Sequence, residues 1–166
     1  MFDLFKSKAR REKEAQVDRI GRNLFRQIAL FRDKCRDGEF TADVFKERAN
    51  HSYTAGYLIG FIDEKLSTLF DSDVEKSKYM TTVITGIFPK TGVSFLQTKY
   101  TARVLAKDLC STDYATRVEG HADAFDLGIE NGRQELLVWE DNPDYTPHLL
   151  TDFLMTGKIN KAQPSH

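Results

Sequence analysis

The amino-acid sequence predicts an all-α fold, a single-domain helical bundle of about six helices. Apolar residues recur at three- and four-residue steps through most of the 166 residues, which is the spacing of a buried helix face. Two of the predicted helices, at about 42–70 and 112–140, contain glycines and are expected to pack closely at the centre. The chain has only 4 prolines and no Pro- or Ser-rich linker. Residues 1–157 are therefore the predicted domain, and 158–166 a disordered tail.

The first predicted helix, from about Ser7 to Arg36, follows a short apolar tip at residues 1–6. Its apolar stripe recurs at three- and four-residue steps and consists of Val17, Ile20, Leu24, Ile28, Phe31 and Cys35. The opposite face, which we call the arginine face, carries Arg11, Arg19, Arg22 and Arg26. Guanidinium groups bind carboxylates and phosphates through paired hydrogen bonds, so this face is a candidate binding surface. The alternative is a solvated face, or one that packs on the acidic remainder of the chain.

Charge is divided unevenly along the chain. Residues 1–36 contain 11 Lys and Arg against 5 Asp and Glu, whereas residues 37–166 contain 13 against 20. A basic N-terminal helix on an acidic body favours contact with a protein partner. Nucleic acid is disfavoured as a partner, because the net charge is only −1 and no aromatic residues interleave with the arginines of the arginine face.

The second predicted helix begins after Thr41, a suitable N-cap residue, and runs to about Phe70. Its central residues, 55–62, carry no charge, which indicates a helix with neighbours on several sides. Glycine in a helix interior costs about 1 kcal/mol relative to alanine. Gly56 and Gly60 therefore indicate that another backbone approaches this helix closely.

The predicted helix over 112–140 offers a matching surface. Ala124, Gly128 and Gly132 repeat the four-residue spacing of small residues. Small residues at this spacing form a shallow groove in which two helix backbones can meet. The two central helices are therefore expected to pack through their glycines.

The remaining segments are also predicted to be helical. Residues 74–88 contain a β-branched run, but we favour a helix because no second strand is evident to pair with it. Another helix is expected over about 93–109. Thr146-Pro147 is expected to start a short last helix that ends at Gly157, since proline suits a first turn and glycine a helix end.

Motifs of catalysis and cofactor binding are not found in the sequence. There is no Walker A or GxGxxG loop, no HExxH pair and no nucleophile elbow. Cys35 and Cys110 stand apart, as free thiols do in a reducing cytoplasm. No uncharged run approaches the ~20 residues of a membrane helix, and the charges from Lys6 onward leave no secretory signal. We therefore expect a cytoplasmic protein without a cofactor, and favour a binding role over an enzymatic one.

Two histidines support a second hypothesis, a site for a small molecule or a metal ion. His51 lies in line with apolar residues of the second predicted helix, and His121 lies in the middle of the apolar face of 112–140. Glu47 and Tyr53 are near enough in sequence to join them. Imidazole and carboxylate groups are common metal ligands. The alternative is two structural histidines, each with its own hydrogen-bond partner.

The first hypothesis is a non-enzymatic protein that acts through protein–protein contact. The arginine face would supply the charge, and Phe2 and Phe5 of the tip would supply buried apolar area. Association with a second copy is a related hypothesis, because an acidic stripe on the helix over 112–140 complements the arginine face. A third hypothesis is attachment of residues 1–11 to a membrane surface.

Overall fold

The computed structural model describes residues 7–89, 92–108, 112–142 and 144–161, with side chains described outside 102–122. The described residues form seven helices, which are α1 (Lys8–Arg36), α2 (Ala42–Ala49), α3 (Ser52–Leu69), α4 (Asp73–Ile87), α5 (Gly92–Asp108), α6 (Thr112–Asp141) and α7 (Leu149–Thr156). They form no strand, so the predicted all-α fold is confirmed, and the ambiguous segment 74–88 lies in a helix. None of the helices in these ranges combines the length and the apolarity needed to cross a membrane.

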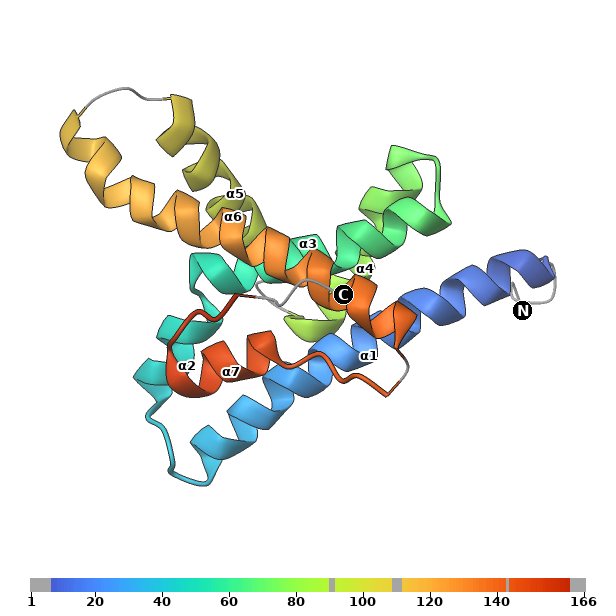
Figure 1. Cartoon of the computed structure of the whole chain (residues 1–166), viewed down its shortest axis with the longest axis horizontal. Coiled ribbons are helices and arrows are strands. Elements are labelled where there is room, and N and C mark those ends of the chain that lie inside the picture. The colour runs from blue at the N-terminus through green and yellow to red at the C-terminus, as the bar shows by residue number, and fades with distance from the viewer. Residues whose placement is uncertain (1–6, 90–91, 109–111, 143, 162–166) are drawn as a thin grey trace.

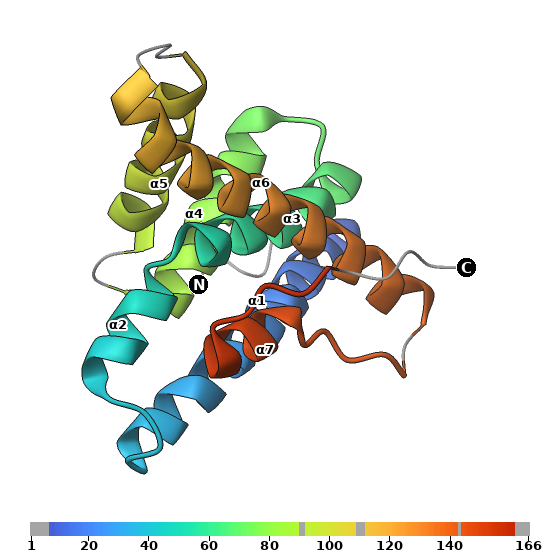
Figure 2. The same cartoon turned by 60° about the vertical axis from the view of Figure 1, so that its left-hand side comes forward.

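Helices α3 and α6 cross at the centre of the molecule, as Figures 1 and 2 show from two directions. A Cβ atom added to Gly60 would overlap the carbonyl oxygen of Ile129 and lie 2.8 Å from its Cα. A Cβ atom added to Gly128 would lie 2.8 Å from the backbone nitrogen of Tyr57. Only glycine lets two backbones meet at this distance, so the predicted close packing of the two glycine-containing helices is confirmed.

The prediction of one continuous helix over 42–70 is wrong, because the helix is interrupted between the end of α2 at Ala49 and the start of α3 at Ser52. His51 has extended backbone angles (φ −68°, ψ 150°), and its ring Nδ1 accepts a hydrogen bond from the backbone N–H of Tyr53 at 3.1 Å. The hydroxyl of Thr54 donates to the carbonyl of Arg48 at 2.8 Å. Side chains thus satisfy backbone groups at this helix boundary. The break adds one helix to the six that were expected.

The predicted start of the last helix at Thr146-Pro147 is also wrong, because α7 begins two residues after the proline. The carboxylate of Glu135, on α6, accepts the backbone N–H of His148 at 2.8 Å and that of Leu149 at 3.1 Å. A side chain from another helix therefore caps α7 and decides where it begins.

The other end of α7 lies where the sequence predicts it. Gly157 has the left-handed backbone conformation (φ 72°) that favours glycine at a helix end. The guanidinium of Arg48, on α2, donates to the carbonyl oxygens of Leu154 and Met155, both at 2.8 Å. A cation thus satisfies the last carbonyls of α7 and joins this helix to α2.

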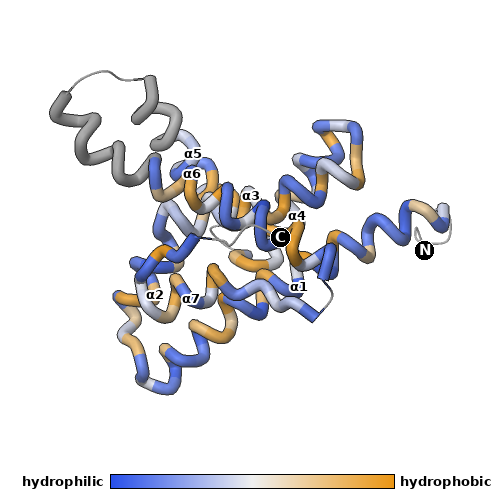
Figure 3. The backbone as a smooth tube through the Cα atoms, in the orientation of Figure 1, coloured by the Kyte–Doolittle hydropathy of each residue, from blue (hydrophilic) through white to orange (hydrophobic). Residues whose placement is uncertain are grey.

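Helix α1 is amphipathic, and Figure 3 shows hydrophobic and hydrophilic residues alternating along it. The predicted apolar stripe is confirmed, because its members from Val17 to Phe31 are at most 6% exposed, while Cys35 is half-buried. The stripe faces α4 and α7, which pack on α1. The four arginines of the arginine face lie outside this stripe and are exposed.

Candidate functional site

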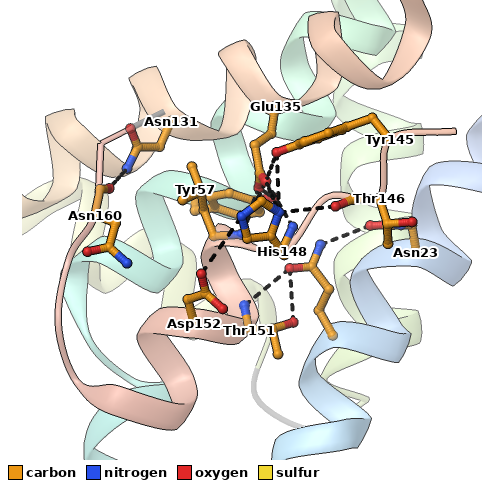
Figure 4. A network of polar contacts seen from close by, with 12 residues as sticks. Asn23, Tyr57, Asn131, Glu135, Tyr145, Thr146, His148, Thr151, Asp152 and Asn160 are labelled. Atoms are coloured by element: carbon orange, nitrogen blue, oxygen red, sulfur yellow. Dashed lines mark hydrogen bonds and ion pairs between the residues drawn. The ribbon is translucent and has the colours of Figure 1, made fainter. Parts of the chain in front are cut away.

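Glu135, on α6, is the centre of a buried polar network (Figure 4). The residue is 1% exposed. Its carboxylate accepts a hydrogen bond from the hydroxyl of Tyr57, on α3, and another at 2.5 Å from the hydroxyl of Tyr145. The backbone N–H groups of His148 and Leu149 donate to the same carboxylate. Donors from four residues therefore compensate the carboxylate for the water that it loses on burial.

Helix geometry explains why Glu135 faces the core. It follows Gly132 by three residues and Gly128 by seven, so it lies on the face of α6 that packs against α3. Tyr57, which is fully buried, follows Gly56 on the facing helix. Our sequence-based hypotheses did not include Glu135, although an acidic residue in line with these glycines was a signal for it.

The two tyrosines of the network keep their protons. Burial raises the pKa of the Tyr57 hydroxyl well above its usual value, and the nearby charge of Glu135 raises it further. Burial also raises the pKa of Tyr145, and the hydrogen bond to Glu135 adds to this effect. Both hydroxyls therefore act as donors toward the carboxylate at neutral pH.

His148 connects the network to the surface, with a side chain that is 52% exposed. Its Nδ1 lies 3.5 Å from Glu135, and its Nε2 lies 3.8 Å from Asp152. A histidine beside a buried carboxylate also occurs in general-base catalysis, where a nucleophile is bonded to the imidazole. The groups bonded to this imidazole in the described structure are the Tyr145 hydroxyl and the carbonyl of Thr146. What the network does in the structure is to join α6 to the start of α7.

A second group of hydrogen bonds anchors the C-terminal segment. The side-chain amide of Asn131, on α6, donates to the hydroxyl of Tyr53 at 2.9 Å and to the carbonyl of Asn160 at 2.7 Å. Burial raises the pKa of Tyr53 to about 12, so this hydroxyl is also protonated at neutral pH. The side chain of Gln27, on α1, accepts the backbone N–H of Thr151 at 3.3 Å. The bond from Asn131 therefore fixes the segment after α7 on α6, and the bond to Gln27 fixes α7 on α1.

The residues predicted for a ligand or metal site lie in different surroundings. Glu47 is exposed on α2. His51 caps α3, and its ring centroid lies 5.1 Å from that of Phe153. Tyr53 is fully buried. Among the residues whose side chains are described, no group of three possible metal ligands occurs. His121 lies outside these side chains, so a site shared by His51 and His121 stays a prediction.

The arginine face of α1 has two parts in the structure. The guanidinium of Arg19 lies 4.2 Å from the ring centroid of Trp139, in a cation–π contact between α1 and α6. Arg11, Arg22 and Arg26 are exposed. Within the described structure, neither Arg22 nor Arg26 forms an ion pair. The face therefore includes one arginine that joins two helices, and two, Arg22 and Arg26, that form no ion pair with the described residues.

An exposed aromatic side chain and a groove adjoin these arginines, so the expectation that no aromatic residue lies among them is wrong. Phe25 is 41% exposed, and the guanidinium of Arg32 lies 5.7 Å from its ring centroid. A groove of about 360 Å³ runs beside it between α1 and α4. The residues that line this α1–α4 groove include Val17, Gly21, Arg22 and Phe25 of α1, and Val83 and Gly86 of α4. Charge, aromatic surface and a concave shape thus occur together on this face.

A second groove, of about 280 Å³, lies where α3, α4 and α5 meet. Its lining includes Ile59, Met80, Ile84, Val93, Leu96 and Tyr100. None of the described residues that line it is charged.

The tip residues Phe2 and Phe5, which complete the predicted partner surface, lie outside the described residues. Their part in binding stays a prediction.

Comparisons with known proteins find no match to this chain, whether among family models, curated proteins or solved structures. The chemistry and geometry of its own surface are therefore the basis for assigning a function.

Proposed function

We propose that this protein is a non-enzymatic binding protein that recognises a protein partner through the exposed face of α1. The observation that supports this proposal is the exposed ring of Phe25 next to two exposed arginines, Arg22 and Arg26, that form no ion pair with any described residue. Aromatic residues and arginines are enriched among the residues that dominate binding at protein interfaces. We call these three residues the α1 patch.

The charge of the α1 patch indicates an acidic partner. An arginine binds a carboxylate through two parallel N–H···O bonds. Arg22 and Arg26 lie about one helical turn apart, so two carboxylates at a similar spacing can bind both. Residues 1–36 contain 11 Lys and Arg against 5 Asp and Glu, and this net positive charge attracts such a partner at longer range. The partner therefore carries Asp or Glu residues around an apolar side chain that packs on Phe25.

Arg19 has a supporting role in this proposal. Its contact with Trp139 holds α1 against α6, so its guanidinium serves the fold first. Arg11, which is exposed nearer the start of α1, extends the positive surface without adjoining Phe25.

Binding is favoured over catalysis because the most chemically active cluster is occupied by the chain itself. Both oxygens of the Glu135 carboxylate accept hydrogen bonds from the tyrosines and backbone groups around them. A cytoplasmic location suits the proposal, since the thiol of Cys35 is free and reducing conditions keep thiols in that state.

The proposal is tested by reversing the charge of the patch. Partners that copurify with the tagged protein from its native cells are identified by quantitative mass spectrometry, and the most enriched one is purified for calorimetric titration. We expect the double variant Arg22→Glu/Arg26→Glu to raise the Kd at least about tenfold, because it replaces two favourable charge contacts with repulsive ones. Phe25→Ser should weaken binding by a similar factor.

The matched control is Lys46→Glu/Lys158→Glu, which changes the net charge equally at two exposed positions that are not part of α1 and do not line the α1–α4 groove. It should leave the Kd within about twofold, since charges outside an interface contribute little to affinity. An unchanged Kd in the Arg22→Glu/Arg26→Glu variant, or equal loss in both double variants, would contradict the proposal.

A further inference from the structure

Two glycines inside helices, Gly21 and Gly86, have no reason in the described structure to be glycine. A Cβ atom added to Gly86 would meet no atom within 4 Å. A Cβ atom added to Gly21 would come nearest to Cγ1 of Val83, at 3.7 Å, which is an ordinary van der Waals contact. Neither has a positive φ, unlike Gly38 and Gly157. Glycine in a helix interior is less favourable than alanine, so both positions weaken their helices without a compensating close approach among the described residues.

The contrast with the glycines of the α3–α6 contact is direct. Cβ atoms at Gly60 and Gly128 would overlap the backbone of the facing helix, so that pair of glycines exists to admit another helix. At Gly86 the space in front of the helix backbone is open, and at Gly21 an added Cβ would meet only the side chain of Val83, not another backbone. Both line the α1–α4 groove, one from each wall.

The groove also carries the charge that selects its occupant. Arg22 lines it, and Phe25 forms part of its apolar wall with Val17 and Val83. Arg22 forms no ion pair within the described residues, and Arg26 follows it by four residues on the same helix face. Asp18 is the acidic residue among the described residues of the lining. An occupant with carboxylates at the Arg22 end is therefore complementary in charge.

We propose that the α1–α4 groove receives an acidic helix of the protein partner, with small residues of that helix against Gly21 and Gly86. Its Asp or Glu side chains pair with Arg22 and Arg26, and its apolar residues pack on Phe25. The proposal rests on the function proposed above and specifies the shape and chemistry of the partner.

A helix fits this groove better than an extended peptide. The walls are helices whose backbone groups are bonded within each helix, so they present no edge to which a strand could add. A helix needs only an apolar furrow, anchoring side chains and room for its backbone, and the groove supplies all three. Its volume of about 360 Å³ is at the small end of the range for binding pockets, so it takes a few side chains of one helix.

The test uses a phage-displayed library in which one face of a three-turn, N-capped helix is randomised. The library is selected on the intact protein. Enriched helices are then titrated against four proteins: the wild type, Gly86→Leu, Arg22→Glu/Arg26→Glu, and Ser77→Leu. Gly86→Leu fills the groove where the structure leaves space. Ser77→Leu is the matched control, because Ser77 is exposed on the opposite face of α4.

We expect the enriched helices to carry Asp or Glu together with Gly, Ala or Ser at four-residue spacing. Their affinity should fall at least about tenfold in Gly86→Leu and in the arginine variant, and stay within about twofold in Ser77→Leu. The thermal midpoint of Gly86→Leu should equal or exceed that of the wild type, which separates a blocked groove from a damaged fold.

Other outcomes overturn the inference in distinguishable ways. Helices that lose affinity for the arginine variant but not for Gly86→Leu would refute the groove and leave the α1 patch standing as the binding surface. Failure to enrich any helix, or binding that neither variant weakens, would refute an acidic helix as occupant. A further outcome comes from sedimentation analysis. If the wild type is a dimer and Gly86→Leu dissociates it, the groove binds a second copy of this chain instead.

Discussion

Glu135 shows how a single buried charge can organise a distant part of the chain. A carboxylate loses its water on burial, and it is tolerated only where donors replace that water. Here the donors come from α3, from the loop before α7 and from the first turn of α7 itself. The same bonds that satisfy the charge therefore determine where α7 begins.

Replacing this carboxylate should destabilise the protein strongly. Glu135→Ala leaves the hydroxyls of Tyr57 and Tyr145 and two backbone N–H groups without their acceptor, and we expect a loss of about 3–5 kcal/mol in the free energy of unfolding. Urea denaturation followed by circular dichroism measures it. Glu130→Ala is the control, since Glu130 is exposed on the same helix and should change stability by no more than about 0.5 kcal/mol. A loss below about 1 kcal/mol in Glu135→Ala would show that water replaces the carboxylate.

Single residues were the part of the site that sequence patterns predicted least well. His51 lies in line with apolar residues and suggested a ligand site, which stays a prediction; that its ring accepts a backbone N–H and caps α3 was not anticipated. The role of Glu135 depends on Tyr145 and His148, which reach it only after the chain has turned back on itself. Spacing along one helix identifies a buried carboxylate, whereas its donors are decided by tertiary contacts.

At the scale of elements, the sequence predicted the central contact well, because glycine has few uses inside a helix. Four-residue spacing in two segments predicted that α3 and α6 meet through their glycines, and they do. The break between α2 and α3 was missed because residues 49–52 contain neither proline nor glycine. That boundary depends on the imidazole of His51 acting as a cap, which is a less common use of histidine than the Ser, Thr, Asp and Asn caps.

For this reason, two alanine substitutions should change the stability of the protein in opposite directions. Helix propensity alone makes Gly→Ala stabilising by about 1 kcal/mol inside a helix. Gly60→Ala nevertheless forces its Cβ into the backbone of Ile129, so α3 and α6 must separate, and we expect a net loss of at least about 3 kcal/mol. Gly86→Ala meets no neighbour and should gain up to about 1 kcal/mol. Thermal unfolding of the two variants beside the wild type measures both. If both substitutions changed the stability in the same direction, the close approach of α3 and α6 would be contradicted.

At the scale of the whole molecule, α1 is the element on which the proposed function depends, and it is joined to the rest from several sides. The hydroxyl of Tyr79, on α4, donates to Glu14 at 3.0 Å. Gln27 accepts the N–H of Thr151, on α7, and Arg19 contacts Trp139, on α6. These contacts predict that α1 unfolds together with the body. The sequence-based assignment of residues 1–157 to one domain stays a prediction until such cooperativity is measured.

Trp139 makes the measurement direct, because it is the single tryptophan and Arg19 lies 4.2 Å from its ring. Its fluorescence reports on the contact between α1 and α6, whereas far-ultraviolet circular dichroism reports on all helices. We expect the two urea transitions to coincide, as they do for one cooperative unit. Arg19→Ala should lower the free energy of unfolding from both probes by about 0.5–1 kcal/mol, and Arg26→Ala, without such a contact, should change neither.

If fluorescence changed at lower urea than circular dichroism, α1 would separate first. The α1–α4 groove would then exist only while that contact holds, and partner binding would have to stabilise α1 against the body.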